Sequence, residues 1–373
     1  MHFETLAVHA GRKPDPASGA VALGITVSTV FARNADGQPL GDYNYARVDN
    51  PNRHALESCL AQLEGGIAAM AFSAGVAASA AVLFALRPGD HVIAPLDLYV
   101  GNRLLLNNEL KHWGLRINYV DFTDLDAVRA ATTSATRLLW AETPSNPLLE
   151  VSDIAALADI AHAVGAALAV DNTFATPILQ SPLALGADYA VHSSSKYFGG
   201  HSDVIGGAVV ARADTPLTQR IRRHQITAGS IPAPFDCWLL LRSLATLPLR
   251  IRSQAANAQA LAEFLAAHPA IERVHYPGLP DHPGHALARQ QMRGFGAVLS
   301  VRLRDGKAAA LRMVSKVQLF ARATSLGGVE SLIEHRASSE GLGSTAPEDL
   351  VRISVGIEHI DDLIEDLRAA LAK

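Results

Sequence analysis

The chain has 373 residues, 49% of them hydrophobic and 18% charged, which excludes an intrinsically disordered protein and supplies apolar side chains for about two domains. The formal net charge of −4 comes from 32 basic and 36 acidic residues, so neither nucleic acid nor a membrane surface is expected as a partner. The sequence shows no signal-peptide pattern and no uninterrupted apolar stretch of about 18 residues, and we expect a cytoplasmic protein whose Cys59 and Cys237 are buried thiols.

The first two expected regions cover residues 1–51 and 52–235. Residues 1–51 are rich in Gly, Pro, Asp and Asn with little periodicity, which predicts an extended arm that needs a partner surface. Residues 52–235 alternate short apolar runs with helical stretches such as 153–165, which predicts a large domain with a mainly parallel sheet and helices on both faces. Its expected strands are at 68–72, 91–95, 117–121, 137–142, 166–171 and 189–193.

Residues 236–373 are expected to form a smaller α/β domain. The helical pattern over 234–268 predicts one long helix, which would join this domain to the large one. Strands are predicted at 297–303 and 350–356, and an amphipathic helix at 361–373. The expected fold class is therefore α/β, with a large mainly parallel sheet followed by a smaller C-terminal α/β domain.

Polar side chains follow several of the expected strands, at the edge where open parallel sheets bind ligands. These residues are Tyr99, Asn146, Asp171, Ser193, Ser195 and Lys196. A glycine turn after the first expected strand opens a helix at Gly75 and Val76, whose backbone N–H groups would be free to bind an anion.

Each of these residues also has an ordinary structural explanation. The glycine turn could be only a tight turn, and the serines could be local turn formers. Asp171 could cap a helix, Tyr99 could pack against its neighbours, and Lys196 could extend its charge into solvent. Because all of them fall on one edge of the sheet, we favour a shared chemical role.

The combination matches what pyridoxal phosphate (PLP) needs from a protein. A lysine bonds to the aldehyde of this cofactor, and we interpret Lys196 as that residue, which needs a pKa below the usual value of about 10.4 to lose its proton. Asp171 would keep the pyridine nitrogen protonated, and the ring of Tyr99 would stack on the cofactor. A helix N-terminus and hydroxyl groups would hold the phosphate, from Gly75, Val76, Ser193 and Ser195.

A family resemblance rests on eight motifs that follow one another along the chain. They are YNYARVDNP (43–51), FSAGVAA (72–78), LDLYVG (96–101), ETPSNP (142–147), VDNTFATP (170–177), HSSSKYFGGHSDVIGG (192–207), SLGGVESLIEH (325–335) and VRISVGIEH (351–359). In these motifs the chain resembles the Cys/Met-metabolism (trans-sulfuration) branch of fold-type I PLP-dependent enzymes, which includes cystathionine γ-synthase, cystathionine γ-lyase and methionine γ-lyase. The resemblance covers nearly the whole chain and implies the aminotransferase-like fold of PLP-dependent transferases.

The resemblance implies roles for residues that the strand pattern alone does not explain. Tyr45 and Arg47 would reach the phosphate of the neighbouring subunit's cofactor, which implies a homo-oligomer of active dimers, usually a tetramer. Asn146 would contact the ring hydroxyl of the cofactor and the substrate carboxylate. Thr173 would lie near the ring, beside Asp171.

The resemblance also implies a substrate and a reaction. Arg352 would bind the α-carboxylate of an amino-acid substrate, with Ser325 nearby. Lys196 would move the Cα proton, and Tyr99 would act as acid or base at the leaving group. The reaction would be γ-replacement by a thiol, or γ-elimination to a 2-oxo acid and ammonia, on a homoserine-derived sulfur or oxygen amino acid.

Some positions depart from the family's common pattern. Asn44 and Thr324 stand where members that use cystathionine carry acids, which removes two contacts to the distal ammonium of cystathionine. Gly101 stands where methionine γ-lyases have a cysteine, and Arg336 replaces a proline. Arg336 and Arg103 either face the site and bind an anionic or hydrogen-bonding distal group, such as an O-acyl ester, or are surface charges.

Several alternatives remain at this stage. Within the family they are a γ-lyase for another amino acid with a heteroatom at Cγ, similar to methionine γ-lyase, and a cystathionine β-lyase. Outside it they are a catalytically silent PLP-fold binding protein and a lysine-dependent aldolase without cofactor. The sequence leaves open the substrate, the preference between replacement and elimination, and a dimer against a tetramer; no metal site is expected.

Overall fold

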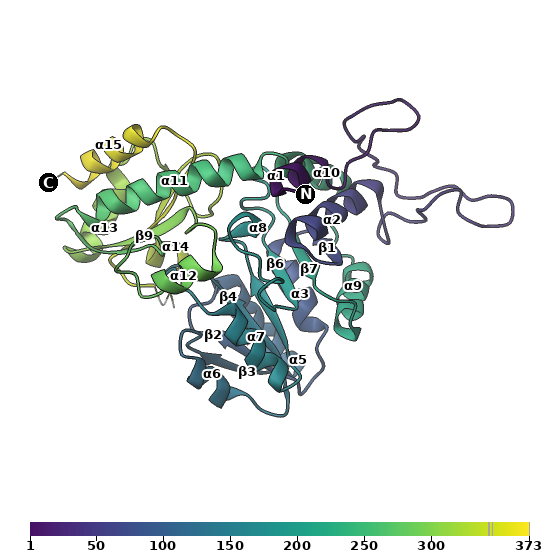
Figure 1. Ribbon diagram of the computed structural model, residues 1–373, viewed down its shortest axis with the longest axis horizontal. Helices are drawn as coiled ribbons and strands as arrows, with labels where there is room; N and C mark the ends of the chain where they lie inside the picture. The colour runs from purple at the N-terminus through teal and green to yellow at the C-terminus, as the bar shows by residue number, and fades with distance from the viewer. Residues whose placement is uncertain (342–343, 345, 373) are drawn as a thin grey trace.

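The computed structural model describes residues 1–341, 344 and 346–372. Within them the chain forms two sheets with helices packed around them (Figure 1). Residues 342, 343, 345 and 373 of the expected third region lie outside the described residues, and the last of these is the end of the helix expected at 361–373. In the described part of the chain, no helix is long and apolar enough to cross a membrane.

The large sheet has the strand order β1-β7-β6-β5-β4-β2-β3. Neighbouring strands from β6 to β3 are parallel, whereas β7 is antiparallel to both of its neighbours. The expected mainly parallel sheet is confirmed, and β7 is a strand that the sequence pattern missed. The strands are β1 (Ala68–Phe72), β2 (His91–Pro95), β3 (Arg116–Val120), β4 (Thr136–Glu142), β5 (Ala167–Asp171), β6 (Tyr189–His192) and β7 (Gly207–Ala211).

Helices cover both faces of the large sheet because successive side chains of a strand point in opposite directions. In β4, Trp140 packs in the same apolar cluster as α3 (Gly75–Phe84), whereas Leu139 packs with α7 (Ile154–Ala163). The other helices of this part are α2 (Pro51–Glu64), α4 (Val100–Leu104), the π-helix η1 (Leu105–Leu110), α5 (Lys111–Trp113), α6 (Leu125–Ala131), α8 (Thr176–Leu179) and α9 (Pro216–Ala228).

The small sheet has the strand order β10-β11-β12-β9-β8. Its strands are β8 (Ile271–His275), β9 (Val298–Leu303), β10 (Ala321–Arg322), β11 (Leu332–His335) and β12 (Leu350–Ser354), of which β9 and β12 were expected. The helices that follow the chain through this part are α12 (His285–Gln291), α13 (Gly306–Lys316), α14 (Arg336–Glu340) and α15 (Ile360–Leu371).

The prediction of a single long helix over 234–268 is wrong. The structure has two helices there, α10 (Pro234–Leu244) and α11 (Leu247–Ala266). Pro248 is the second residue of α11, and inside one continuous helix its ring would clash with the carbonyl of Leu244 while leaving that carbonyl without a donor. Thr246 therefore leaves the helical conformation, with φ −103° and ψ 1°, and the chain starts a new helix.

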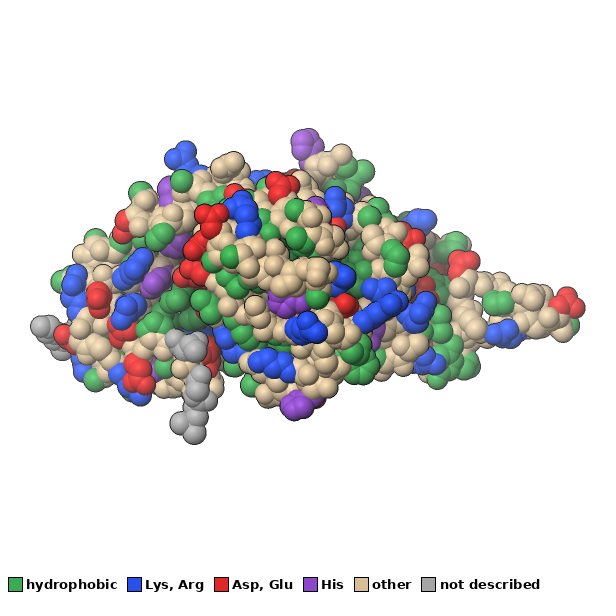
Figure 2. All heavy atoms as spheres, turned by 90° about the horizontal axis from the view of Figure 1, so that it is seen from below, with side chains coloured by type: hydrophobic (Ala, Val, Ile, Leu, Met, Phe, Trp, Pro, Cys, Tyr) green, Lys and Arg blue, Asp and Glu red, His purple; other side chains and the backbone are tan. Residues whose placement is uncertain are grey.

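The arm, residues 1–51, is only partly extended. Its first residues form α1 (Phe3–His9), whose Ala7 is fully buried in the core, a helix that the sequence pattern missed. The rest of the arm leaves the body as long loops, and Figure 2 shows the same extension standing off the surface. These loops carry apolar side chains that are largely exposed, among them Val21 (83%), Val27 (75%) and Leu40 (69%).

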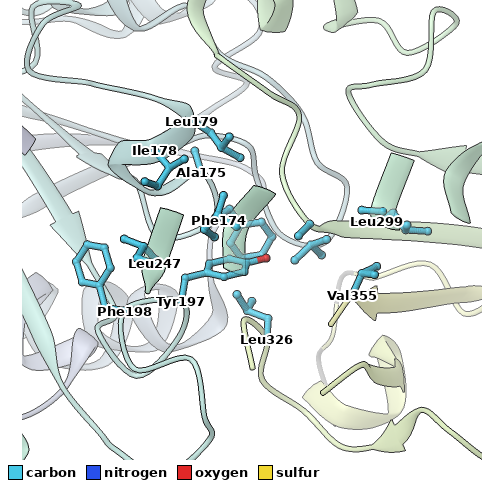
Figure 3. Packing of buried hydrophobic residues seen from close by; sticks show 14 of the residues in the cluster. Phe174, Ala175, Ile178, Leu179, Tyr197, Phe198, Leu247, Leu299, Leu326 and Val355 are labelled. Atoms are coloured by element: carbon cyan, nitrogen blue, oxygen red, sulfur yellow. The ribbon is translucent and has the colours of Figure 1, made fainter. Parts of the chain in front are cut away.

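One apolar cluster joins the two sheets and fixes the segment after β6. Tyr197 and Phe174 from the large-sheet side lie beside Leu326 and Val355 from the small-sheet side (Figure 3). Tyr197 is 1% exposed, and its hydrophobic ring anchors the residue directly before it, Lys196. The position of that lysine therefore follows from packing between the sheets.

Glu57 of α2 fastens β1 to the neighbouring helices. Its carboxylate accepts hydrogen bonds from the Ala71 N–H (2.8 Å), Arg222 Nη1 (2.6 Å) and Gln225 Nε2 (2.7 Å). Glu57 is buried, so the Ala71 N–H would lose its acceptor if the carboxylate were removed. Gln225 Nε2 would keep the Ala71 carbonyl oxygen (2.6 Å), and Arg222 Nη1 would keep Gln225 Oε1 (3.0 Å). This network holds the strand that leads into Gly75.

We expect Glu57→Ala to lower the free energy of unfolding by about 3 kcal/mol, because it leaves the Ala71 N–H without an acceptor and removes the carboxylate that pairs with Arg222. Glu57→Gln keeps an oxygen acceptor of the same shape and should lose clearly less. Urea denaturation followed by circular dichroism measures both variants. Equal losses for Ala and Gln would contradict the hydrogen-bond explanation.

Candidate active site

A cavity of about 730 Å³ lies between the carboxyl edge of the large sheet and the small sheet. It brings together most of the residues that the sequence placed in a site. Those in its lining are Gly75, Val76, Tyr99, Asn146, Asp171, Thr173, Ser193, Ser195, Lys196, Ser325 and Arg352.

Lys196 is held at the junction of the two sheets. Its Nζ donates a hydrogen bond to Ser325 Oγ at 2.6 Å. Burial and the nearby cations Arg352 and Arg336 lower the pKa of Lys196 to about 8, although Glu334 opposes this shift. A lysine with this pKa supplies neutral amine close to neutral pH, which nucleophilic and base chemistry both require.

Ser325 occupies an unusual backbone conformation beside this lysine. Its φ is 92°, in a region that L side chains rarely adopt and that costs about 1–3 kcal/mol. The next turn also lies close to the Lys196 segment, because a Cβ on Gly327 would lie 2.7 Å from the Tyr197 nitrogen. The loop therefore keeps its strained shape through contact with the lysine segment.

Arg352 of β12 is buried at 3% exposure and makes contacts with both sheets. Its Nη1 donates to Asn146 Oδ1 and its Nη2 to the Ser325 carbonyl oxygen, each at 2.9 Å. Its guanidinium also forms an ion pair with Glu334, which lies opposite it in the β11–β12 register. Burial lowers the pKa of Arg352 to about 10, with Glu334 opposing, so this arginine is a fixed cation in the cavity.

Asp171 ends β5 and is held in place by Thr173. Thr173 Oγ1 donates to Asp171 Oδ1 at 2.5 Å, and the Thr173 N–H donates to the same oxygen at 3.1 Å. The Ser193 N–H in turn donates to Thr173 Oγ1 at 2.9 Å. Burial raises the pKa of Asp171, whereas the Thr173 hydrogen bonds and His192 act in the opposite direction.

The N-terminus of α3 opens toward the same cavity. The first backbone N–H groups of a helix have no acceptor within it, and the N-cap residue Ala74 has no side chain to cap them. A Cβ on Gly75 would lie 2.8 Å from Ser193 Oγ, so only glycine allows this approach. Ser193 lies beside this helix end, whereas the Ser195 hydroxyl exchanges hydrogen bonds with the Gly206 backbone.

Tyr99 is 38% exposed in the cavity wall, and its N–H donates to Glu142 Oε2 at 3.0 Å. A Cβ on Gly101 would lie 2.5 Å from Tyr99 Cε1, so a side chain at 101 would displace the ring. Glu142 is a cavity residue that sequence reasoning missed. It ends β4 as Asp171 ends β5, so the same strand-end rule could have identified it.

Burial and the nearby Asp171 raise the pKa of Glu142 well above its ordinary value, with the Tyr99 N–H opposing. The pKa of Asp171 is raised less strongly, because the Thr173 hydrogen bonds oppose the effect of burial, so Glu142 is the member of this pair that binds a proton first as the pH falls.

The two arginines left open by the sequence have different positions. Arg336 is buried and lines the cavity, where it pairs with Glu334 (Nη1–Oε1 3.1 Å). Arg103 is not part of the lining; its guanidinium bonds to the Leu96 carbonyl and lies 5.2 Å from the Tyr119 ring centroid. Of the two alternatives left open for Arg103, its position therefore fits the charge that lies outside the cavity.

Tyr45 and Arg47 lie on the arm, outside the cavity of their own chain. The Arg47 guanidinium is 5.6 Å from the Tyr45 ring centroid, and its Nη1 donates to the Ile226 carbonyl at 2.8 Å. Tyr45 is 40% exposed.

The chain matches a family model described as "Cys/Met metabolism PLP-dependent enzyme" over residues 4–372. The fold and the lysine-centred cavity are therefore those of a PLP-dependent enzyme. The chain belongs to the Cys/Met metabolism family of these enzymes. The family resemblance, the fold class and the expected cofactor are confirmed.

Relatives with different names are similar along their whole length. A cystathionine gamma-synthase of Mycobacterium tuberculosis is 51% identical, over 98% of this chain and 96% of that protein. A cystathionine beta-lyase of Coxiella burnetii is 45% identical, over 99% of this chain and 98% of that protein. The crystal structure of metB from Corynebacterium glutamicum has a TM-score of 0.97 and 43% identity, over 100% of this chain and 98% of that one.

In protein freed of cofactor, we expect the acylation rate of Lys196 to rise with pH, because only the neutral amine reacts. The midpoint of that rise should give an apparent pKa of about 8 instead of the ordinary lysine value of 10.5. Labelling with acetic anhydride at a series of pH values, read by peptide mass spectrometry, measures it. Arg352→Met removes a cation that lowers this pKa, so the midpoint should move upward. A midpoint at the ordinary lysine value in the unmodified protein would contradict the burial argument.

Proposed function

We propose that this protein catalyses γ-replacement or γ-elimination on a homoserine-derived amino acid, as a cystathionine γ-synthase or γ-lyase does. One observation carries the proposal: Ser325 joins a desolvated lysine to a buried arginine, through Lys196 Nζ at 2.6 Å and Arg352 Nη2 at 2.9 Å. An α-carboxylate bound by Arg352 would bring the substrate α-carbon beside the Lys196 amine. This is the arrangement that removal of a Cα proton requires.

The residues of the cavity fit PLP. The open N-terminus of α3 at Gly75 and Val76, with the Ser193 and Ser195 hydroxyls, would hold the phosphate. A protonated pyridine nitrogen beside Asp171 would compensate for burying that carboxylate. Lys196 would attach the cofactor, and Thr173, Asn146 and the Tyr99 ring would position it.

PLP, when bound, withdraws electrons from the substrate α-carbon and so acidifies its proton. The Lys196 Nζ takes that proton, and the Ser325 hydroxyl keeps Nζ oriented. Arg352 and Asn146 hold the carboxylate, and the Tyr99 hydroxyl supplies a proton to the group that leaves Cγ. A thiol that then bonds to Cγ gives a thioether. Where no thiol adds, Cγ takes up a proton and water attacks Cα, which releases a 2-oxo acid and ammonia.

The cavity supports an O-acyl-homoserine type of substrate in preference to cystathionine. Thr324 lines the cavity at a position where an acid would bind a distal ammonium. Asn44 is held within the arm, where its Oδ1 accepts from Arg33 Nη2 at 2.6 Å. The relative at 51% identity is named a cystathionine gamma-synthase, which favours γ-replacement, and the beta-lyase at 45% identity makes β-elimination the second candidate.

We also propose a cytoplasmic homotetramer built from two active dimers. The arm supports this assembly, because it exposes apolar side chains such as Val21, Val27 and Leu40 that another subunit could bury. Tyr45 and Arg47 lie outside their own cavity, so we assign them to the phosphate of the neighbouring subunit's cofactor.

The test presents the PLP-loaded enzyme with O-succinylhomoserine, O-acetylhomoserine, cystathionine and methionine, each with and without cysteine, while thioether and 2-oxo acid are measured together. We expect thioether from an O-acyl-homoserine, and Lys196→Ala should lower kcat about 10³-fold. A higher kcat/KM for cystathionine cleavage than for any O-acyl-homoserine would contradict the substrate assignment. Pyruvate formed from cystathionine would support β-elimination instead.

The arm assignment predicts that two inactive variants restore activity when their subunits are mixed. Lys196→Ala lacks the lysine but has an intact arm, and Arg47→Met has the reverse defect. Unfolding and refolding them together should recover about one quarter of the unmodified activity, because half of the dimers then contain one complete site. Activity no higher than the sum of the separate variants would mean that the arm acts on its own subunit.

A further inference from the structure

Four charged side chains with alternating signs form a row at the wall of the cavity, and three of them are buried. They belong to Glu340 and Arg336 of α14, Glu334 of β11 and Arg352 of β12. Arg336 Nε lies 2.9 Å from Glu340 Oε1, and Arg336 Nη1 lies 3.1 Å from Glu334 Oε1. The same Glu334 oxygen also pairs with Arg352 Nη2. The side chains of Glu334, Arg336 and Arg352 are between 3% and 5% exposed, so water screens this row poorly.

Glu334 places a carboxylate where it competes with a ligand of Arg352. It lies directly opposite Arg352 in the antiparallel β11–β12 pair, so the two side chains leave the sheet on the same face and stay within reach of each other. A carboxylate bound by Arg352 must share that guanidinium with Glu334. Glu334 and the ligand carboxylate would then be neutralised by Arg352 alone in a desolvated site, and their mutual repulsion would weaken binding of the ligand.

Arg336 supplies the second cation. It shares the Glu334 oxygen that faces Arg352, so Glu334 stays neutralised while Arg352 turns its charge to a ligand. Glu334 and Glu340 both flank the Arg336 guanidinium, so an anion bound there would share its charge with two carboxylates, compared with one at Arg352. This geometry decides against the alternative that Arg336 binds a distal anionic group of the substrate.

We propose that Arg336 is a positioning residue, which neutralises Glu334 and so keeps Arg352 available to the α-carboxylate of the substrate. The inference rests on the proposed role of Arg352 as the carboxylate-binding residue. It adds that the strength of carboxylate binding is set by the balance of charges behind Arg352. The α14 helix, through one side chain, therefore tunes amino-acid affinity without touching the substrate.

The test measures dissociation constants by the change in the cofactor's visible absorption, with L-norleucine and with pentan-1-amine, which lacks the carboxylate. Arg336→Met should raise the Kd for norleucine about tenfold and leave that for the amine within about twofold. Glu334→Gln removes the competing charge and should not weaken norleucine binding. The double variant Glu334→Gln/Arg336→Met should return to within about threefold of the unmodified enzyme.

Two further variants separate the possible failures. Arg302→Met breaks another arginine–carboxylate pair of the same sheet, with Asp349 at 3.0 Å and outside the cavity, and should leave both constants unchanged. Arg352→Met should weaken norleucine binding strongly; if it does not, the proposed role of Arg352 fails. If Arg352→Met weakens binding but Arg336→Met does not, or weakens amine binding equally, this inference alone is overturned.

Should Arg336→Met not fold, Arg336→Lys and the double variant decide. Lysine keeps the charge, so Arg336→Lys should hold the norleucine Kd within about threefold. The double variant also lacks the Glu334 charge that Arg336→Met leaves without its partner, so it avoids that cost to folding. A norleucine Kd that rises about tenfold in Arg336→Lys, with the amine Kd unchanged, would contradict a role through charge.

Discussion

The cavity depends on one hydrogen bond between the two sheets, from Lys196 Nζ to Ser325 Oγ. Lys196 follows β6, and Ser325 lies in the loop between β10 and β11. Each end of this contact is held separately: Tyr197 is buried in the apolar cluster between the sheets, and Arg352 binds the Ser325 carbonyl oxygen. Because packing holds the strained Ser325 backbone in place, the amine meets its partner without reorganisation.

Burial of charge then gives the cavity two chemically different ends. Lys196, Arg352 and Arg336 make the end beside the small sheet cationic, whereas Asp171 and Glu142 place carboxyl groups at the ends of β5 and β4. Desolvation lowers the pKa of Lys196 and raises the pKa of both carboxyl groups. A substrate carboxylate is therefore attracted to one end, and a protonated ring nitrogen fits the other.

Sequence patterns predicted the features that depend on a single strand or helix, and they failed for features that depend on contacts between particular residues. The strand-end rule identified Asp171 and Asn146 because parallel strands end at the same edge of the sheet. Apolar periodicity continues through 234–268, so it did not detect that Pro248 divides this stretch into two helices. Sequence patterns left the same two alternatives open for Arg103 and Arg336, and only their contacts with Tyr119 and Glu334 in the structure distinguish them.

The sequence by itself determined the α/β class, the lysine-centred edge of the large sheet and the family, because strand-end residues and ordered motifs are properties of short segments. Only the tertiary structure decided which charges share one desolvated space. Arg336 and Glu334 meet Arg352 because β11 and β12 pair in one register, and Tyr45 and Arg47 lie outside their own cavity because the arm leaves the body. Electrostatic balance depends on distances and burial across the chain, and neither is encoded in the spacing of residues along it.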